Sequence, residues 1–443
     1  MKKVVWLGAL LILLVAVPMA GCKNVDDAKG DGKETMGKGE GVLDEPVTIT
    51  IMGFAMMVDD DIIDEFFKPI TDKYPNVSLK ATSDSIEDMV AAGKVPDMII
   101  TSNPGLYDNI ENELASDLSE FFDRQNIDIS RFNPAIVEDL EKHAEVFDTP
   151  GAIYAMPLSL NYGVLIYNKD IFDTFGVNYP EAGITWDDVI ELARKTTGTR
   201  NGVEYIGLDP GWIHELFRAH SLSYVDDNGQ VDLMTDGFKE VMDVFSQAYS
   251  IPGMIGENEE NYGYGGMGIF IEERRLAMFP AWVTMVTENI PLMEESGLNW
   301  DITSFPTFTS TPEFGRNIDY HAMIIPETAE NREAALQIAA EMVSDEAQLY
   351  LSEKVNRVTV LDNTEIRESY ATGSNAYDGK HLQDIFEVEP SLDRKPTPYN
   401  QELDELMMEL RRKLAVENND VNTVLREAQE KAETLVKEFK KKQ

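Results

Sequence analysis

The sequence has one cysteine in 443 residues, Cys22. With no second thiol, the chain forms no internal disulfide and no cysteine-ligated metal cluster, so its fold depends on its core. Hydrophobic residues make up 43% of the chain and aromatic residues 9%, which is enough for a sizeable core. The length favours two folded lobes over one.

Basic residues are also few. There are 38 Lys and Arg against 80 Asp and Glu, a formal net charge of −42. A surface of this sign excludes nucleic acid as a partner and repels an anionic membrane surface. Because carboxylates are so numerous, no single Asp or Glu pair indicates catalysis. A glycosidase needs two carboxylates about 5–10 Å apart, and the sequence leaves that alternative open.

Catalytic and metal-binding motifs are missing too. The five histidines lie at scattered positions without metal-ligand spacing: His143, His214, His220, His321 and His381. There is no Gly-x-Ser-x-Gly and no phosphate-binding loop, and Gly263-Tyr-Gly265 lacks the strand-to-helix context of a dinucleotide fingerprint. We expect a protein that is not an enzyme and uses no cofactor and no metal.

One long hydrophobic run is present, at the N-terminus. Lys2 and Lys3 precede the apolar stretch Val4 to Val17, and Met19-Ala-Gly stands just before Cys22. This arrangement resembles a bacterial lipoprotein leader, which predicts a signal peptide over 1–21 and a lipid on Cys22. The alternative is an uncleaved anchor, although the run is at or below the roughly 17–25 residues that a spanning helix needs. Residues 22–45 are polar and Gly-rich, which predicts a flexible tether on the outer face of the cell membrane.

The next segment alternates strands and helices. Alternating apolar residues predict a strand over 47–51, apolar residues at helical spacing predict a helix from about residue 59 to before Pro75, and further strands are expected at 77–80 and 97–101. A helix beginning at Ser85 separates the last two. Such β-α-β-α-β order predicts a parallel sheet, and ligands collect at the carboxyl ends of parallel strands. Those ends are residues 53–57 and 101–105.

A second group of elements starts near residue 152. Thr185 and Asp188 have the spacing of a capping box, which predicts a helix to about residue 195 with Trp186 in a structural position. A strand at 322–325 and a helix at 332–343 indicate a return to the first lobe. The chain ends in two amphipathic helices, with stripes over 403–414 and 421–439.

Three blocks carry a family resemblance. Gly151-Ala-Ile-Tyr-Ala-Met-Pro157, Val164-Leu-Ile-Tyr-Asn-Lys-Asp-Ile-Phe172 and Thr185-Trp-Asp-Asp-Val-Ile-Glu-Leu-Ala193 resemble the central signature of the family 1 extracellular solute-binding proteins. Weaker supporting segments are 95–100, 275–282 and 420–428. Members of this family are periplasmic or lipid-anchored receptors of carbohydrate ABC transporters.

The resemblance implies an α/β, two-lobe periplasmic-binding-protein-like fold of type II, with hinged lobes of mixed sheets covered by helices. It implies the following division: lobe 1 at 46–155, with a return at about 315–370 and part of the C-terminal helices; lobe 2 at 156–314; and C-terminal helices at 371–443 packing across the lobes. It also implies a small-molecule solute, a carbohydrate bound by a maltose-binding-like receptor, and the membrane subunits of an ABC permease as partners. We expect a monomer.

The resemblance maps ligand-binding residues onto this sequence. Asn161 is the fourth residue after Pro157, where the maltose type commonly has Glu, so maltose itself is not implied. Trp282 corresponds to an aromatic that stacks on a sugar ring, although core packing explains a Trp there equally well. The full set of candidates is Phe54, Thr101, Ser102, Asn103, Asn161, Tyr162, Asp209, Trp212, Trp282, Arg316, Tyr320 and Tyr399.

Other ligands and functions stay open at this point. A receptor of the same fold can bind an oligopeptide, a polyol or a uronate-bearing oligosaccharide. A surface carbohydrate-cleaving enzyme and a structural lipoprotein without a ligand are the alternatives from other classes.

Overall fold

The computed structural model describes residues 41–53, 58–82, 84–226, 228–255, 266–417 and 419–442. The predicted leader, Cys22, most of the tether and Phe54 lie outside these ranges. Among the described residues, no helix combines the length and the hydrophobicity needed to cross a membrane.

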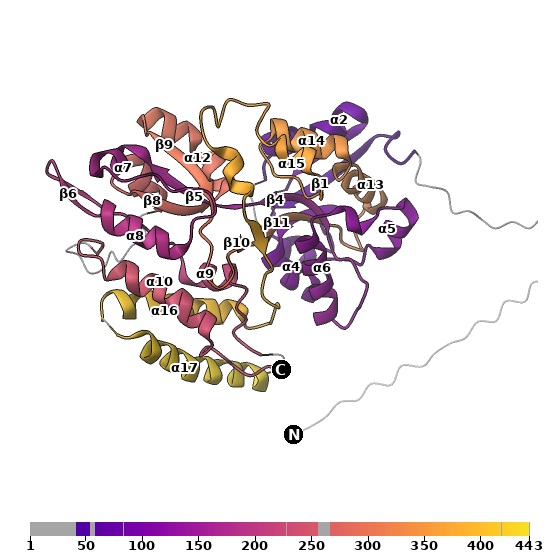
Figure 1. Cartoon of the computed structure of the whole chain (residues 1–443). Helices are drawn as coiled ribbons and strands as arrows, with labels where there is room; N and C mark the ends of the chain where they lie inside the picture. Colours follow the sequence, from indigo (N-terminus) through magenta and orange to yellow (C-terminus); the bar gives the residue numbers. More distant parts are fainter. Residues whose placement is uncertain are drawn as a thin grey trace, which may run out of the picture. The chain divides into compact units, whose positions relative to one another are not determined.

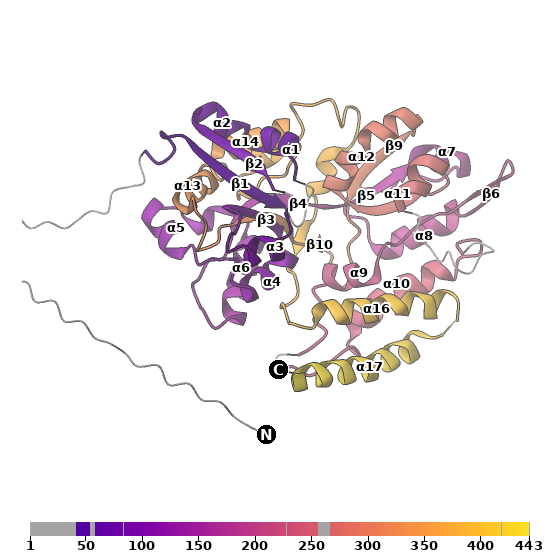
Figure 2. The same ribbon diagram turned by 180° about the vertical axis from the view of Figure 1, so that it is seen from behind.

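The first lobe is built on a five-stranded sheet (Figures 1 and 2). Strands β1 (Val47–Gly53), β2 (Val77–Ala81) and β3 (Met98–Ser102) are parallel, with β1 between the other two. Their connections contain α1 (Asp60–Phe66), α2 (Lys68–Lys73) and α3 (Ile86–Ala91). The predicted strand-helix alternation is therefore confirmed.

One helix prediction in this segment is wrong. The helix expected from about residue 59 is divided at Phe67 into α1 and α2. Pro69 explains the division, because proline has no backbone N–H and its ring clashes with the preceding helical turn. It occupies the first turn of α2, where proline is tolerated.

The sheet is completed by strands from later in the chain. β11 (Asp319–Ile324) lies between β3 and β4 (Met156–Asn161) and is antiparallel to both, which gives the order β2-β1-β3-β11-β4. The sheet is mixed because the chain re-enters it from the opposite end after building the second lobe. The strand at 156–161 thus belongs to the first sheet, whereas the sequence placed the start of lobe 2 at residue 156.

Helices cover this sheet. They are α4 (Asn103–Glu111), α5 (Ser119–Gln125), α6 (Pro134–Val146), α13 (Arg332–Met342), α14 (Asp345–Lys354) and α15 (Thr364–Glu368). Helix α4 packs on β3, β11 and α6, while α13 packs on β1, β4 and α2. Residues 129–131 form a 3-10 turn before α6.

The second lobe has a three-stranded antiparallel sheet. β5 (Gly163–Asn168) is central, between β8 (Met278–Trp282) and β9 (Trp300–Ser304). Side chains of β5 alternate between two apolar clusters, with Val164 and Ile166 in one and Leu165 and Tyr167 in the other. Both faces of this sheet are therefore buried.

Lobe 2 contains the helices α7 (Lys169–Phe175), α8 (Trp186–Thr196), α9 (Ile213–Ala219), α10 (Asp236–Tyr249), α11 (Gly266–Gly268) and α12 (Val283–Ser296), a π-helical turn at 269–273 and the hairpin of β6 (Gly198–Arg200) and β7 (Val203–Tyr205). The predicted cap of α8 is confirmed, because the Thr185 hydroxyl accepts a hydrogen bond from the backbone N–H of Asp188 at 3.2 Å. Trp186 is buried against Phe305.

Three segments connect the lobes. β4 leads directly into β5 through Tyr162, the chain returns through β10 (Phe314–Asn317), and a third segment after α15 includes the 3-10 turn 382–386 and β12 (Glu389–Ser391). β10 and β12 pair in parallel, so two of these segments are hydrogen-bonded to each other.

The C-terminal helices are α16 (Asn400–Ala415) and α17 (Val421–Lys442). They pack on each other and on α10, and α16 also packs on α9. Their buried side chains, such as Leu403, Met407 and Leu425, belong to the apolar cluster of lobe 2. The sequence predicted that they pack across the lobes; in the structure their apolar stripes pack on α9 and α10 of lobe 2.

Candidate functional site

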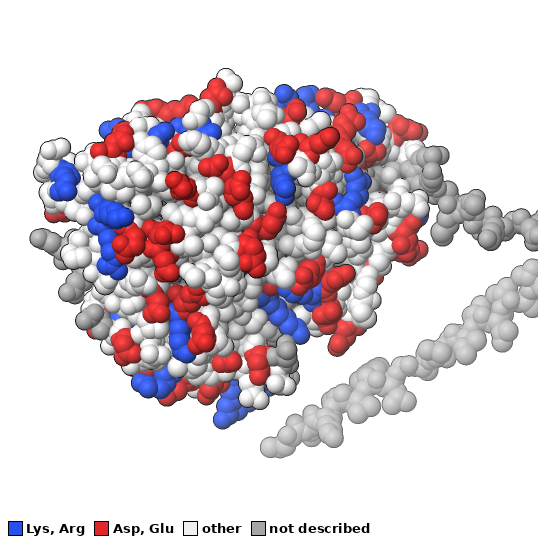
Figure 3. All heavy atoms as spheres, in the orientation of Figure 1, with Lys and Arg blue, Asp and Glu red and all other residues white. Residues whose placement is uncertain are grey.

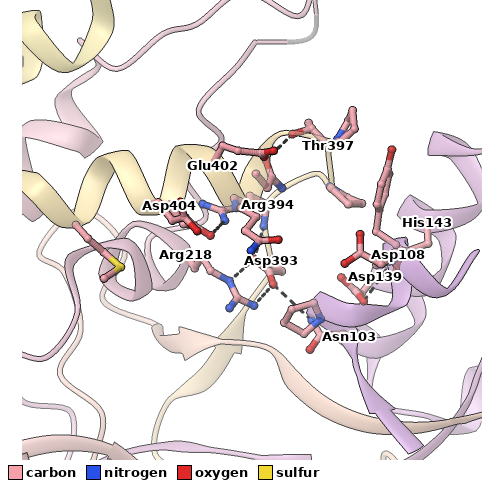
Figure 4. Close-up of a pocket in the computed structure, with 18 residues that line it drawn as sticks. Asn103, Asp108, Asp139, His143, Arg218, Asp393, Arg394, Thr397, Glu402 and Asp404 are labelled. Carbon is pink, nitrogen blue, oxygen red and sulfur yellow. Dashed lines mark hydrogen bonds and ion pairs between the residues drawn. The ribbon is translucent and has the colours of Figure 1, made fainter. Parts of the chain in front are cut away.

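A cavity of about 340 Å³ lies between the two lobes (Figure 4). Helices α4 and α6 form its lobe 1 wall, and the end of α9 with the segment leading into α16 forms the opposite wall. Its polar lining includes Asn103, Asp108, Asp139, His143, Arg218, Asp393, Arg394, Glu402, Asp404 and Glu405. Tyr107 and three prolines add apolar surface.

Asp393 is the centre of this lining. Its buried carboxylate accepts hydrogen bonds from Arg218 Nε at 3.2 Å, from Arg218 Nη2, and from the Arg394 backbone N–H at 2.8 Å. Asn103 Nδ2 approaches it from lobe 1 at 3.5 Å, and its backbone carbonyl accepts from Lys142 of α6 at 3.1 Å. Asp393 therefore bonds to both lobes from the third connecting segment.

Electrostatics keep this pair ionised. Burial alone would raise the pKa of Asp393, but the Arg218 guanidinium and the hydrogen bonds bring that pKa below its usual value. Burial alone would likewise lower the pKa of Arg218, and Asp393 raises it instead. A planar guanidinium held against a carboxylate presents fixed donors and acceptors toward the cavity.

Arg394 makes a second ion pair beside the first. Its Nη2 donates to Asp404 Oδ2 at 2.5 Å, and its Cζ lies 4.4 Å from the ring centroid of Tyr224. Within the described residues, its buried Nη1 has no hydrogen-bond partner.

The lobe 1 wall contains a buried carboxyl group. Asp139 accepts a hydrogen bond from the hydroxyl of Tyr320 at 2.8 Å, and its other neighbour is His143, whose Nδ1 lies 3.6 Å from Oδ2. Burial raises the pKa of Asp139 above its usual value. Tyr320 is itself fully buried and does not line the cavity, but its hydrogen bond fixes the position of Asp139, which does.

A further polar cluster adjoins the cavity along α9. Glu215, one helical turn before Arg218 on the same face, forms an ion pair with Arg316 Nη2 at 2.6 Å. The Arg316 guanidinium lies over the ring of Trp282, with Cζ 3.7 Å from the ring centroid. One face of Trp282 is therefore covered by Arg316, and the residue as a whole stays half-buried.

Arg316 also fixes a glycine. A Cβ added to Gly163 would lie 2.2 Å from Cβ of Arg316, because the first and second connecting segments cross there. We expect Gly163→Ala to lower the free energy of unfolding by about 1–3 kcal/mol, since a methyl group cannot fit without moving a buried side chain. Urea denaturation measures this. Gly268→Ala is the matched control, because nothing lies within 4 Å of its Cβ; equal midpoints for the two variants would contradict the expectation.

Asn161 lies at the same crossing. Its Nδ2 donates to Asp319 Oδ2 at 2.9 Å, and its Oδ1 accepts from the hydroxyl of Thr284 at 3.0 Å. It thereby connects β4 and β11 of the first sheet with the start of α12 in lobe 2. Tyr162, the next residue, is buried and packs edge-on against Phe386.

The other predicted residues lie away from the cavity. Thr101 is buried in β3 and accepts from Asn109, while Ser102 precedes α4 without a side-chain cap bond. Asp209 accepts from the backbone N–H groups of Gly211 and Gly266, both at 3.1 Å, so it holds two loops together.

Two aromatic candidates contact the C-terminal helices. Trp212, at the start of α9, has the Arg411 guanidinium 5.3 Å from its ring centroid. Tyr399 packs edge-on against Phe439 of α17 within the lobe 2 core. Of the eleven predicted binding residues that the structure describes, Asn103 alone appears in the lining of the cavity.

Sequence reasoning missed Arg218, Asp393 and Arg394. A local signal was present for the last two, because the sequence places opposite charges side by side between Pro390 and Pro396, and two prolines so close together disfavour a regular helix or strand. No such signal marked Arg218, which looks like any other charged residue of a short helix. Among the described residues, no group of three or more His, Cys, Asp or Glu is placed to hold a metal ion.

Several solved structures share the two-lobe fold of this chain. An ABC substrate-binding protein from Listeria monocytogenes in complex with cycloalternan is 18% identical, with a TM-score of 0.69 over 87% of this chain and 97% of its own. A sugar transporter from Rhizobium etli in an open conformation is 18% identical, with a TM-score of 0.68 over 87% and 98% of the two chains. Maltose-bound MalE3 of T. maritima is 15% identical, with a TM-score of 0.62 over 88% and 100%. These likenesses confirm the two-lobe α/β fold of solute-binding proteins.

The family follows from the sequence itself. The profile of the family described as bacterial extracellular solute-binding protein matches residues 58–349. This range is more than half of the 443 residues, and the chain belongs to that family.

Proposed function

We propose that this chain is the receptor of an ABC importer and that it binds a saccharide in the cavity between its lobes. The observation that carries the proposal is the cavity lining, where paired guanidinium and carboxylate groups stand opposite an amide of the other lobe. Similar structures were solved with cycloalternan and with maltose, which supports a saccharide as the solute.

The lining suits the chemistry of sugars. Neighbouring hydroxyl groups are both donors and acceptors, so planar side chains such as those of Arg218, Asp393 and Asn103 can bind them in pairs. Tyr107 and Pro396 offer apolar surface for the C–H side of a ring. The cavity falls near the lower end of the roughly 300–1,000 Å³ usual for small-molecule sites, which favours a short saccharide.

Closure of the lobes is the proposed mechanism. A solute that contacts Asn103 on lobe 1 and Arg218 on lobe 2 favours the closed state by the free energy of contacts that exist only there. The moving bodies are the first sheet with its helices, residues 46–161 and 319–370, and the second sheet with α16 and α17. A permease that recognises the closed form then receives loaded receptor, and the receptor itself leaves the saccharide uncleaved.

We further propose that a lipid on Cys22 tethers the receptor to the outer face of the membrane, as the leader of the sequence predicts. We propose that the receptor is a monomer. A polar tether of this length reaches a few nanometres, by roughly 5–6 Å × √n. Mass spectrometry of the mature N-terminus tests this, because a diacylglyceryl thioether changes the mass of the first peptide.

A thermal-shift screen against a saccharide library tests the binding function. A ligand that binds only the folded chain raises the unfolding temperature with its concentration, and stabilises by about 2.7 kcal/mol at 100 times Kd. Chromatography of each hit after incubation must show it unchanged. An unfolding temperature that no saccharide of the library raises would refute the proposed receptor function. Cleavage of a saccharide during incubation would favour an enzyme.

A further inference from the structure

The segment 391–394, which carries Asp393, is fastened to α9 of lobe 2. The Ser391 hydroxyl donates a hydrogen bond to the backbone carbonyl of Ala219, the last residue of α9, at 2.7 Å. Arg218 of the same helix forms an ion pair with the Asp393 carboxylate. The backbone carbonyl of Asp393 therefore has a fixed position on lobe 2.

Lys142 of α6 contacts this segment from lobe 1. Its Nζ donates a hydrogen bond to the Asp393 carbonyl at 3.1 Å and lies 3.4 Å from Oε1 of Glu138, one turn earlier on α6. The Lys142 side chain is 25% exposed, so most of it is shielded from water. Lys142 is not among the residues that line the cavity, although Asp139 and His143 of the same helix are. It therefore joins the two lobes from a position outside the cavity.

Negative charge on both lobes opposes their approach. Asp108 of α4 lines the cavity from lobe 1, and Glu402 and Glu405 of α16 line it from lobe 2. Asp and Glu side chains are also spread over the visible face of the protein (Figure 3), whose formal net charge is −42. Self-repulsion of this kind disfavours the more compact state. A cationic donor that crosses between the lobes offsets part of that repulsion.

The bond from Lys142 belongs to the closed arrangement. Opening the cavity separates α6 from α9, and because the Asp393 carbonyl is fixed to α9, the same motion breaks its hydrogen bond with Lys142. A bond made only in the closed form shifts the equilibrium toward that form. The apparent affinity for a solute rises with the fraction of empty receptor that is already closed.

We infer that Lys142 sets the affinity of the receptor from outside the binding cavity, by holding the lobes closed through the Asp393 carbonyl. This inference rests on the proposed receptor function and identifies a positioning residue for it. Because Lys142 does not line the cavity, its contribution to affinity is the same for every saccharide.

Calorimetric titration of the full chain with each saccharide found in the screen tests the inference. Lys142→Met keeps most of the side-chain length and removes the charge and the donor. We expect it to weaken binding by about three- to tenfold, and by the same factor for each saccharide. Lys142→Arg keeps a cationic donor and should restore most of the lost affinity. Asn103→Ala removes an amide of the lining, so it should weaken different saccharides by different factors.

Lys68→Met is the matched control. Lys68 of α2 pairs with Asp72 one turn away at 2.7 Å, as Lys142 pairs with Glu138, but its Nζ forms no hydrogen bond with another element of the described chain. This variant should bind each saccharide as the parent does. Urea denaturation checks that both methionine variants fold.

Small-angle X-ray scattering gives a second reading that needs no solute. We expect the empty Lys142→Met variant to have a larger radius of gyration than the empty parent and Lys68→Met, because more of its molecules are open. With saturating saccharide, the three proteins should have the same radius. An equal radius for the empty parent and Lys142→Met would contradict the inference.

The possible results separate the two proposals. If Lys142→Met binds every saccharide as tightly as the parent, or if its loss of affinity differs from one saccharide to another, the Lys142 inference fails and the saccharide receptor stands. If no saccharide binds the parent, the receptor proposal fails, and the scattering of the empty proteins still decides whether Lys142 holds the lobes closed.

Discussion

Replacing Arg218 with alanine is expected to lower the free energy of unfolding by about 3–5 kcal/mol, because the variant leaves the buried Asp393 carboxylate without its counter-charge. Arg218 provides two hydrogen bonds to that carboxylate, and the remaining donors are the Arg394 backbone N–H and the more distant Asn103 amide. Urea denaturation followed by circular dichroism measures the loss.

The pH dependence of this loss follows from the pKa of Asp393. In the parent its folded pKa lies below the unfolded value, so its contribution to stability is present above about pH 4 and is lost as the pH falls through the folded pKa. In Arg218→Ala, burial without the counter-charge raises that pKa above the unfolded value, so protonation relieves the variant. The stability difference between the two proteins should therefore narrow as the pH falls.

A double variant is the matched control. Arg218→Met with Asp393→Asn removes both charges and keeps most of the side-chain volume, so it should recover most of the stability lost in Arg218→Ala. A loss below about 1 kcal/mol in the single variant would mean that solvent reaches the carboxylate. That outcome would contradict the claim that the buried Asp393 carboxylate holds the two lobes together through its ion pair with Arg218.

The second large effect is expected at Trp282. Trp282 is not among the residues that line the cavity, and its stacking role is the one that the family resemblance implies. On that role, Trp282→Ala should weaken saccharide binding at least tenfold, while the empty protein loses only about 1 kcal/mol because the indole is half-buried. The small structural cost is the lost stacking with Arg316. Titration of the saccharide found in the screen, together with urea denaturation of the empty variant, gives both numbers.

Arg316→Met separates the two roles of this pair. Methionine keeps contact with the indole and removes the guanidinium and its ion pair with Glu215, so binding should fall less than in Trp282→Ala. If Trp282→Ala instead lowers stability by several kcal/mol and leaves affinity unchanged, the indole is a core residue and the stacking role is wrong.

Much of the fold could be predicted because it depends on local pattern. Alternating apolar residues identified β1 and β2, and the Thr185 hydroxyl caps α8 as its spacing with Asp188 predicted. The antiparallel direction of β11 is different, since it depends on where the chain returns from lobe 2. The position of α16 and α17 depends on the matching apolar face of α10. Their own apolar stripes do not reveal which helix they pack against.

The lining of the candidate cavity overlaps the sequence prediction only at a residue that follows a strand. Asn103 stands directly after β3, and the rule that ligands collect at strand ends led to it. Arg218, Asp393 and Arg394 come from a helix end and an irregular connecting segment, and they meet because of how the lobes pack. Tyr320 and Asp209 have suitable side chains for a ligand, but burial and existing hydrogen bonds engage them in the structure.

A crystal structure of the protein with the saccharide found in the screen tests the central claim most directly. We expect the saccharide between the lobes, with hydrogen bonds to Asn103 on one side and to Arg218 or Arg394 on the other. A saccharide bound on the outer surface of a single lobe, with the cavity between the lobes empty, would contradict the account.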